Sequence, residues 1–133
     1  MSYLKYAYVS GITNDSFCIG LLIMFRSLNQ VCLDRSIERV CFVTENVSHE
    51  TRRRIEKEYI HCIETEVINV NASGRWKTTF QKLVVFSFTQ YDRIVWIDAD
   101  MIVTRNLDDL FEKPHMSCVR SRAPMLTRGG VLI

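Results

Sequence analysis

The sequence lacks the features that mark several large classes of protein. No run of about 18 apolar residues occurs, the length that a membrane-spanning helix requires, and no cationic leader followed by an apolar stretch opens the chain. We therefore expect no membrane span and a cytoplasmic location. The five cysteines are odd in number and show no C-x-x-C spacing, which argues against a disulfide framework and against a zinc site.

A strong charge of one sign is also missing. The net charge is +2 at pH 7, far from the basic excess that is typical of nucleic-acid-binding domains. The densest basic cluster, at residues 52–54, lies among glutamates in a helical pattern and is typical of a solvated helix face. We therefore expect no nucleic acid among the partners. The G-x-G-x-x-G fingerprint is absent too, so a nicotinamide dinucleotide is not indicated.

What is present is the composition of one globular domain. The 133 residues, 47% of them apolar and 24% charged, are enough to bury a real core, and we expect a single domain over residues 1–133. Residues 127–133 stop inside what has the pattern of a beginning strand. We therefore expect the chain to be truncated on its C-terminal side.

Extended and helical patterns alternate along the sequence. Strands are predicted at 3–10, 39–44, 66–70 and 93–97, with shorter ones at 101–103, 116–120 and 130–133. Helices are predicted after the capping residues at 13–16, after Ser48, over 76–90 and for one turn around 107–111; the second of them would turn Ile55 and Tyr59 inward. This order predicts an α/β fold, a Rossmann-like, mostly parallel sheet with helices on both faces.

The most informative stretch is 93–103, where an apolar strand ends in Asp98 and Asp100. On extended backbone, side chains two residues apart point to the same face. The carboxyl ends of parallel strands are where α/β proteins bind ligands, and Mg²⁺ or Mn²⁺ prefers oxygen ligands that it shares with phosphates. The pair therefore indicates a metal–diphosphate site, although an acidic turn between two strands would show the same pattern.

Four segments, taken in order, resemble glycosyltransferase family 8 and its glycogenin-like members in particular. Residues 6–20 are similar to the family's first strand, its Thr-Asn-Asp turn and the start of its helix. Lys82 stands sixteen residues before Asp98, where the family places a lysine on the helix that precedes its metal motif. Residues 95–103 resemble that motif, and 106–111 resemble the Asn-hydrophobe-Asp-Glu-Leu-Phe segment that follows it. The resemblance extends from residue 6 to residue 133.

The resemblance implies a GT-A type domain that transfers a hexose from a UDP-sugar with retention, with Mn²⁺ (or Mg²⁺) bound. It also implies that Thr13, Asn14 and Phe17 line the nucleoside pocket. Phe17 stands in place of the family's usual tyrosine. A phenyl ring can still stack on the base, but the phenolic hydroxyl is lost.

The same resemblance assigns the remaining site residues. Lys82 would contact the donor sugar or the diphosphate as a compact point charge. Asp98 would touch the ribose or the metal, and Asp100 would ligate the metal. Lys82 and Asp98 are therefore the catalytic candidates, Asp98 and Asp100 the metal ligands, and Ala99 between them part of the nucleotide-sugar site.

Two departures from the family concern the end of the chain. The family usually carries Asn-x-Gly-Val, with the asparagine facing the donor sugar, where residues 128–131 here read Arg-Gly-Gly-Val. The family's third metal ligand is a histidine far downstream, and none of His49, His61 and His115 matches that position. We therefore expect a donor-binding half that binds a UDP-sugar weakly and does not transfer sugar alone, its acceptor unknown. The apolar end invites a neighbouring strand or a homo-oligomer.

Two other functions remain open. A haloacid-dehalogenase-type phosphatase also carries Asp-x-Asp after an apolar strand, with Asp98 as nucleophile and Asp100 as acid and base. Against it, Ile102 occupies the Thr or Val position, and only 33 residues follow Asp100. The other is a non-catalytic nucleotide-sugar-binding or interaction module, which Arg128 and the missing histidine favour.

Overall fold

A six-stranded sheet forms the centre of the computed structural model, which describes residues 4–68, 80–120 and 127–132, with side chains over 4–68 and 81–118. The strands stand in the order β3-β2-β1-β4-β6-β5. β3, β2, β1 and β4 are parallel, β6 is antiparallel to β4, and β5 is antiparallel to β6, so the predicted mostly parallel sheet is confirmed. The strands are β1 (Tyr6–Ile12), β2 (Glu38–Val43), β3 (His61–Glu64), β4 (Arg93–Ile97), β5 (Cys118–Arg120) and β6 (Thr127–Leu132).

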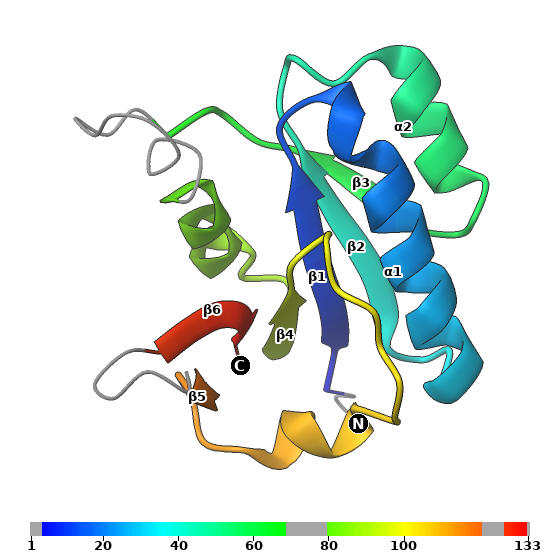
Figure 1. Cartoon of the computed structure of the whole chain (residues 1–133). Helices are drawn as coiled ribbons and strands as arrows, with labels where there is room; N and C mark the ends of the chain where they lie inside the picture. The colour runs from blue at the N-terminus through cyan, green and yellow to red at the C-terminus, as the bar shows by residue number, and fades with distance from the viewer. Residues whose placement is uncertain (1–3, 69–79, 121–126, 133) are drawn as a thin grey trace.

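Helices cover both faces of the parallel part of the sheet, as expected (Figure 1). α1 (Cys18–Val31) and α2 (His49–Glu56) lie on one face, and the 3-10 helix η2 (Phe80–Ser87) lies on the other. Two more 3-10 helices, η1 (Asp15–Phe17) and η3 (Asp108–Glu112), precede α1 and follow β4. The spacing over 76–90 predicted an ordinary α-helix; 76–79 lie outside the described residues, and 80–87 take the tighter 3-10 form. No helix in the described part of the chain has the length and apolarity needed to cross a bilayer.

Two apolar cores form because β1 is buried on both faces. Tyr8 and Ile12 point into the core beneath α1 and α2, whereas Val9 points into a second core with Phe42 and Trp96. Side chains alternate between faces along a strand, so both halves of the alternation are apolar here. This double burial explains why β1, β2 and β4 are continuous apolar runs in the sequence.

Polar side chains start the helices at the carboxyl end of the parallel strands. Asn14 Oδ1 accepts a hydrogen bond from the backbone N–H of Ser16 at 3.0 Å, and Ser48 Oγ accepts one from Thr51 N–H at 3.3 Å. Ser48 N–H in turn donates to Asp15 Oδ1 at 2.9 Å, which ties the start of α2 to the turn before α1. The predicted cap at Ser48 is present on α2, whereas Asn14 caps η1 and leaves α1, whose N-cap is Phe17, without a side-chain cap.

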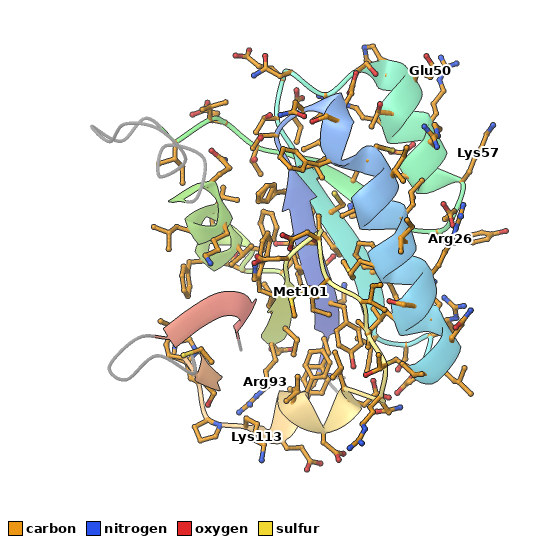
Figure 2. All side chains as sticks on the ribbon, in the orientation of Figure 1. Arg26, Glu50, Lys57, Arg93, Met101 and Lys113 are labelled. Atoms are coloured by element: carbon orange, nitrogen blue, oxygen red, sulfur yellow. The ribbon has the colours of Figure 1, made fainter. Side chains whose placement is uncertain are left out.

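Buried polar contacts hold the opposite end of the sheet together. Arg39 is 5% exposed, and its guanidinium donates to the carbonyls of Cys32 and Ile37 and lies 5.5 Å from the ring centroid of Tyr8. The Tyr8 hydroxyl donates to Asp108 Oδ1 at 2.5 Å, and burial raises the pKa of Tyr8 well above its usual range. Figure 2 shows Arg93 beside η3, where it donates to the carbonyl of Phe111 at 2.7 Å. The hydrogen bonds of Tyr8 and Arg93 anchor η3 at this end of the sheet.

Two predicted strands are wrong because neither segment has a neighbouring strand to pair with among the described residues. Residues 65–68 of the described chain are not extended into a strand, and β3 instead occupies 61–64, where it pairs with β2 from Val40 opposite His61 to Val43 opposite Glu64. Because β2 ends at Val43, a strand at 66–70 would have no neighbour; 69 and 70 lie outside the described residues. Residues 101–103 pack on α1 rather than on a strand, and Val103 N–H donates to Ser27 Oγ at 2.8 Å.

Tyr59 does not lie on the inner face of the second helix, as its spacing from Ile55 predicted. α2 ends at Glu56, and Tyr59 takes a left-handed conformation with φ of 62°, its N–H donating to the Glu56 carbonyl at 3.0 Å. Its side chain is 90% exposed. The chain reverses here to enter β3, which points the ring into solvent.

We expect Tyr59→Gly to raise the free energy of unfolding by about 0.5–1 kcal/mol, because glycine adopts positive φ without the steric cost that a Cβ brings. Urea denaturation of wild type and variant measures the change. Tyr59→Ala is the matched control, since it removes the ring but keeps Cβ, and it is expected to give no such gain. Equal stability of the two variants would show that the backbone conformation carries no cost.

Candidate functional site

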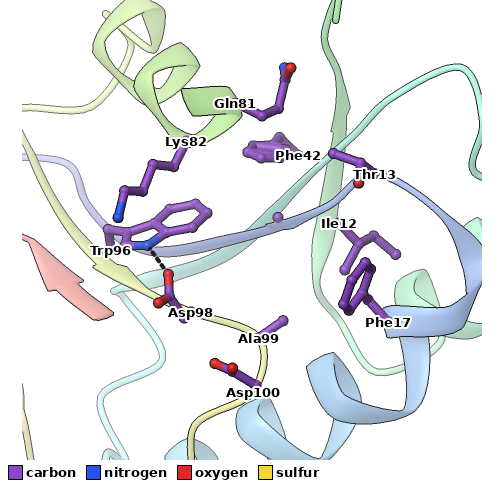
Figure 3. Close-up of a pocket in the computed structure, with 11 residues that line it drawn as sticks. Ile12, Thr13, Phe17, Phe42, Gln81, Lys82, Trp96, Asp98, Ala99 and Asp100 are labelled. Atoms are coloured by element: carbon purple, nitrogen blue, oxygen red, sulfur yellow. Dashed lines mark hydrogen bonds between the residues drawn. The ribbon is translucent and has the colours of Figure 1, made fainter. Parts of the chain in front are cut away.

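A cavity of about 270 Å³ opens at the carboxyl end of the parallel strands (Figure 3). Four segments meet there: the end of β1 with its following turn, the end of β2, the start of η2, and the end of β4 with its following loop. This is the edge at which ligands bind in α/β sheets. The residues that line the cavity are Gly11, Ile12, Thr13, Phe17, Phe42, Gln81, Lys82, Trp96, Asp98, Ala99 and Asp100.

Six of the seven residues singled out in the sequence lie around this cavity. They come from three segments far apart in the chain, namely the turn after β1, η2 and the loop after β4: Thr13, Phe17, Lys82, Asp98, Ala99 and Asp100. Asn14, the seventh, lies beyond the lining that the described residues form. Its side chain caps η1 instead, where it accepts from the Ser16 N–H and hydroxyl.

The Asp98 carboxylate is the most constrained acid in the cavity. Its Oδ1 accepts a hydrogen bond of 2.6 Å from the indole Nε1–H of Trp96. Burial raises the pKa of Asp98, and Asp100 raises it further, whereas the Trp96 hydrogen bond and the charge of Lys82 oppose the rise. In Figure 3 the Lys82 side chain extends from η2 into the same part of the cavity as Trp96 and Asp98. The carboxylate therefore sits where added positive charge would stabilise its ionised form.

The donor set suits a hard divalent cation that is shared with a ligand. Asp98 and Asp100 offer carboxylate oxygens, and Asp100 is exposed to the cavity mouth. Among the described residues, no group of three His, Cys, Asp or Glu side chains could hold a metal ion. Magnesium-type sites commonly use one or two carboxylates and complete their shell with phosphate oxygens and water. The residues present thus fit a cation bound together with a diphosphate.

Two aromatic rings that the sequence analysis did not single out form the floor of the cavity. Phe42 and Trp96 stack with ring centroids 5.6 Å apart and planes 24° apart. Gly11 faces Phe42 on the neighbouring strand, and a Cβ at Gly11 would lie 2.1 Å from the Phe42 ring. A glycine inside a strand pattern often marks such a close approach, so Gly11 was a usable signal.

The start of η2 is anchored by Gln81, another residue that the sequence analysis did not identify. Its side chain is 3% exposed; Oε1 accepts from Ile68 N–H and Nε2 donates to the Glu66 carbonyl, both at 2.8 Å. This pair of bonds ties η2 to the segment after β3. The neighbouring Lys82 therefore follows a residue whose side chain is bonded at both its oxygen and its nitrogen.

Comparison with known proteins gives a consistent family match. Residues 9–117 match the family model described as glycosyl transferase family 8. An uncharacterized protein of Acanthamoeba polyphaga mimivirus is 36% identical over 115 residues, which are 81% of this chain and 40% of that protein. Glycogenin-1 of Homo sapiens is 32% identical over 119 residues, 84% of this chain and 33% of that protein. The chain spans less than half the length of either relative.

Solved structures share the fold at lower identity. The glycosyltransferase GlyE of Streptococcus pneumoniae matches with a TM-score of 0.69 and 21% identity, over 98% of this chain and 34% of that one. The galactosyltransferase LgtC, solved in complex with donor and acceptor sugar analogs, matches with a TM-score of 0.70 and 17% identity, over 95% of this chain and 56% of that one. Both place the sheet and its helices in the GT-A type architecture.

Proposed function

Since this chain belongs to glycosyl transferase family 8, we propose that it binds the nucleotide-sugar donor of a sugar-transfer reaction. The observation that carries the proposal is the convergence of two carboxylates, a lysine and the turn after β1 on one cavity at the sheet edge. The family also sets aside the phosphatase alternative. We propose a UDP-sugar as the donor, a retaining hexosyl transfer as the reaction of the whole protein, and residues 1–133 as one donor-binding domain.

The uridine is assigned to the turn after β1. The Phe17 ring is 51% exposed and lines the cavity, so one of its faces is available to stack on the base. Thr13 lines the same wall. Asn14 contributes by shaping the turn, because its side-chain oxygen is engaged in capping η1. The diphosphate then lies toward Lys82 and the two aspartates.

Mn²⁺ or Mg²⁺ would be held by Asp98 and Asp100 together with diphosphate oxygens. Such a cation would supply positive charge that offsets the negative charge developing on the departing nucleoside diphosphate. Lys82 supplies a second, fixed positive charge to the same oxygens. The Trp96 hydrogen bond fixes the direction of one carboxylate oxygen of Asp98.

We also propose a reducing compartment such as the cytoplasm, because all five cysteines are unpaired.

Backbone NMR of the labelled chain tests where the donor binds. Addition of UDP-glucose or UDP-galactose with Mg²⁺ is expected to shift the amide resonances of Gly11, Phe17 and Ala99 most strongly. ADP serves as the nucleotide control and is expected to shift them less. Shifts that concentrate instead in the groove between η2 and β4, around Phe88 and Tyr91, would contradict the assignment.

Lys82→Ala is expected to weaken binding of UDP-glucose about tenfold or more while leaving uridine binding nearly unchanged. The reason is that the lysine charge is assigned to the diphosphate or sugar and not to the base. Calorimetric titration of both ligands gives the comparison, with Lys57→Ala on the exposed end of α2 as control. An equal loss of affinity for uridine and for UDP-glucose would contradict the assignment of Lys82 to the diphosphate or sugar.

A second candidate function, donor binding without transfer, applies to the 133-residue chain taken alone. It is favoured by the donor set, since the described residues offer two carboxylates but no third metal-ligating side chain with them. Transfer also needs an acceptor aligned with the anomeric carbon, and a misplacement of about 1 Å can cost on the order of 100-fold in rate. We therefore expect no turnover of UDP-glucose or UDP-galactose with Mn²⁺, measured as hydrolysis and self-glycosylation. Clear turnover would contradict the expectation.

A further inference from the structure

We infer that Trp96 is a positioning residue that selects the cation: by holding one oxygen of Asp98, it favours small octahedral ions over Ca²⁺. The inference rests on the proposed function, because it concerns the cation that would bind with the diphosphate. Trp96 would not bind the cation itself. Its role follows from its contacts with Asp98 and Phe42.

The first step is the hydrogen bond itself. Trp96 and Asp98 are two residues apart at the end of β4, so their side chains emerge on the same face. The indole Nε1–H donates to Asp98 Oδ1 at 2.6 Å, as Figure 3 shows. A bond this short to a charged acceptor is among the stronger hydrogen bonds in proteins. It leaves Oδ2 as the oxygen of Asp98 that is free of the indole.

The second step is that packing on β1 and β2 restricts rotation of the Trp96 indole. Trp96 is 4% exposed and stacks on Phe42, which is 2% exposed. Gly11 lies opposite Phe42 and leaves the space that the Phe42 ring occupies. The orientation of the donor is therefore set by packing on β1 and β2, and rotation of Asp98 to offer both oxygens would break the hydrogen bond.

The third step is the coordination chemistry of the ions. Ca²⁺ takes six to eight oxygens and readily binds a carboxylate through both of its oxygens, whereas Mg²⁺ demands a compact octahedron of six. A carboxylate with one oxygen already engaged offers single-oxygen ligation. Such a ligand suits the octahedral ion and deprives Ca²⁺ of part of its shell.

The test compares the affinity of UDP in saturating Mg²⁺, Mn²⁺ and Ca²⁺ for wild type and Trp96→Phe, by calorimetry. Wild type is expected to prefer Mg²⁺ and Mn²⁺. Trp96→Phe keeps an aromatic ring but removes the donor, and we expect the preference over Ca²⁺ to fall about tenfold. Val85→Ala, which trims the same apolar core without touching Asp98, is expected to leave the preference unchanged.

Each outcome has a distinct meaning. A variant that binds all three cation complexes more weakly by one common factor would overturn the inference, since Trp96 would then act only in packing. Wild type that binds UDP equally with cation and with chelator would overturn the proposed metal site, and this inference with it. UDP binding that depends on a cation but shows an unchanged preference in Trp96→Phe would leave the proposed function standing and contradict the inference alone.

A second measurement needs no change at Trp96. The sequence holds two tryptophans, so Trp76→Phe leaves one indole N–H resonance to follow by NMR. With Mg²⁺ and UDP, this N–H is expected to stay hydrogen-bonded and slow to exchange with solvent. With Ca²⁺ and UDP, it is expected to move upfield and exchange faster as Asp98 turns toward the ion. Identical behaviour with both ions would overturn the inference.

Discussion

Asp100→Asn is expected to lower the affinity for UDP in the presence of Mn²⁺ by about 100-fold, or about 2.8 kcal/mol, while leaving the fold intact. Asparagine keeps the size and polarity of the side chain but removes the charged oxygen that a hard cation prefers. Because Asp100 is exposed at the cavity mouth, the substitution disturbs little packing. Calorimetry gives the affinity, and thermal unfolding reports on the fold.

Asp109→Asn provides the matched control for this experiment. Asp109 is also an exposed aspartate, but it lies on η3, beneath the opposite end of the sheet. It is expected to leave the affinity for UDP and its dependence on Mn²⁺ as in wild type. If Asp100→Asn behaved like this control, Asp98 and Asp100 would be the acidic turn that the sequence pattern also allows.

Gly11→Ala is the second large effect, and it acts through the floor of the cavity. The added Cβ would lie 2.1 Å from the Phe42 ring, too close for any native contact. Phe42 is buried and stacked on Trp96, so the ring cannot yield without disturbing the residue that holds Asp98. We expect a loss of about 1–3 kcal/mol in the free energy of unfolding and weaker binding of UDP.

A double-mutant cycle separates this clash from a general intolerance of the strand. In a Phe42→Leu background the ring atoms that meet the new Cβ are gone, so Gly11→Ala is expected to cost less than half as much. Chemical denaturation of the four proteins gives the coupling energy. An equal cost of Gly11→Ala in both backgrounds would show that Phe42 is not the residue that requires glycine at this position.

Elements governed by local pattern could be predicted from the sequence. The run from Cys18 shows helical spacing, and α1 spans Cys18–Val31 as that spacing indicates, although the polar cap before it starts η1 and not α1 itself. The buried runs that become β1, β2 and β4 were equally plain. The strand at 66–70 and the one at 101–103 could not be judged locally, because a strand needs a neighbour whose own end decides how far pairing continues. Tyr59 was misplaced because helical spacing does not reveal where a helix ends.

For the cavity, too, some residues could be predicted from local sequence and others could not. The sequence predicted Asp98 and Asp100 as a pair because both follow one strand. It predicted extended backbone between them, whereas the structure places a turn there, with Met101 N–H donating to the Asp98 carbonyl at 3.3 Å. The contact of Gly11 with Phe42 depends on the register of β1 against β2, which no local pattern contains. The Trp96 hydrogen bond to Asp98 required the indole rotamer, which the packing against Phe42 decides. The charged residues of the cavity could therefore be predicted from the sequence, whereas the contacts that orient them could be seen only in the structure.

Calorimetric titration of UDP into the 133-residue chain, with Mn²⁺ and then with excess chelator, tests the central claim most directly. The claim is that Asp98 and Asp100 bind the diphosphate through a shared cation. We expect weak binding in Mn²⁺ whose affinity falls at least tenfold when the cation is removed, and we expect binding to Asp100→Asn not to depend on the cation. UDP binding of the same affinity with Mn²⁺ and with chelator would contradict it.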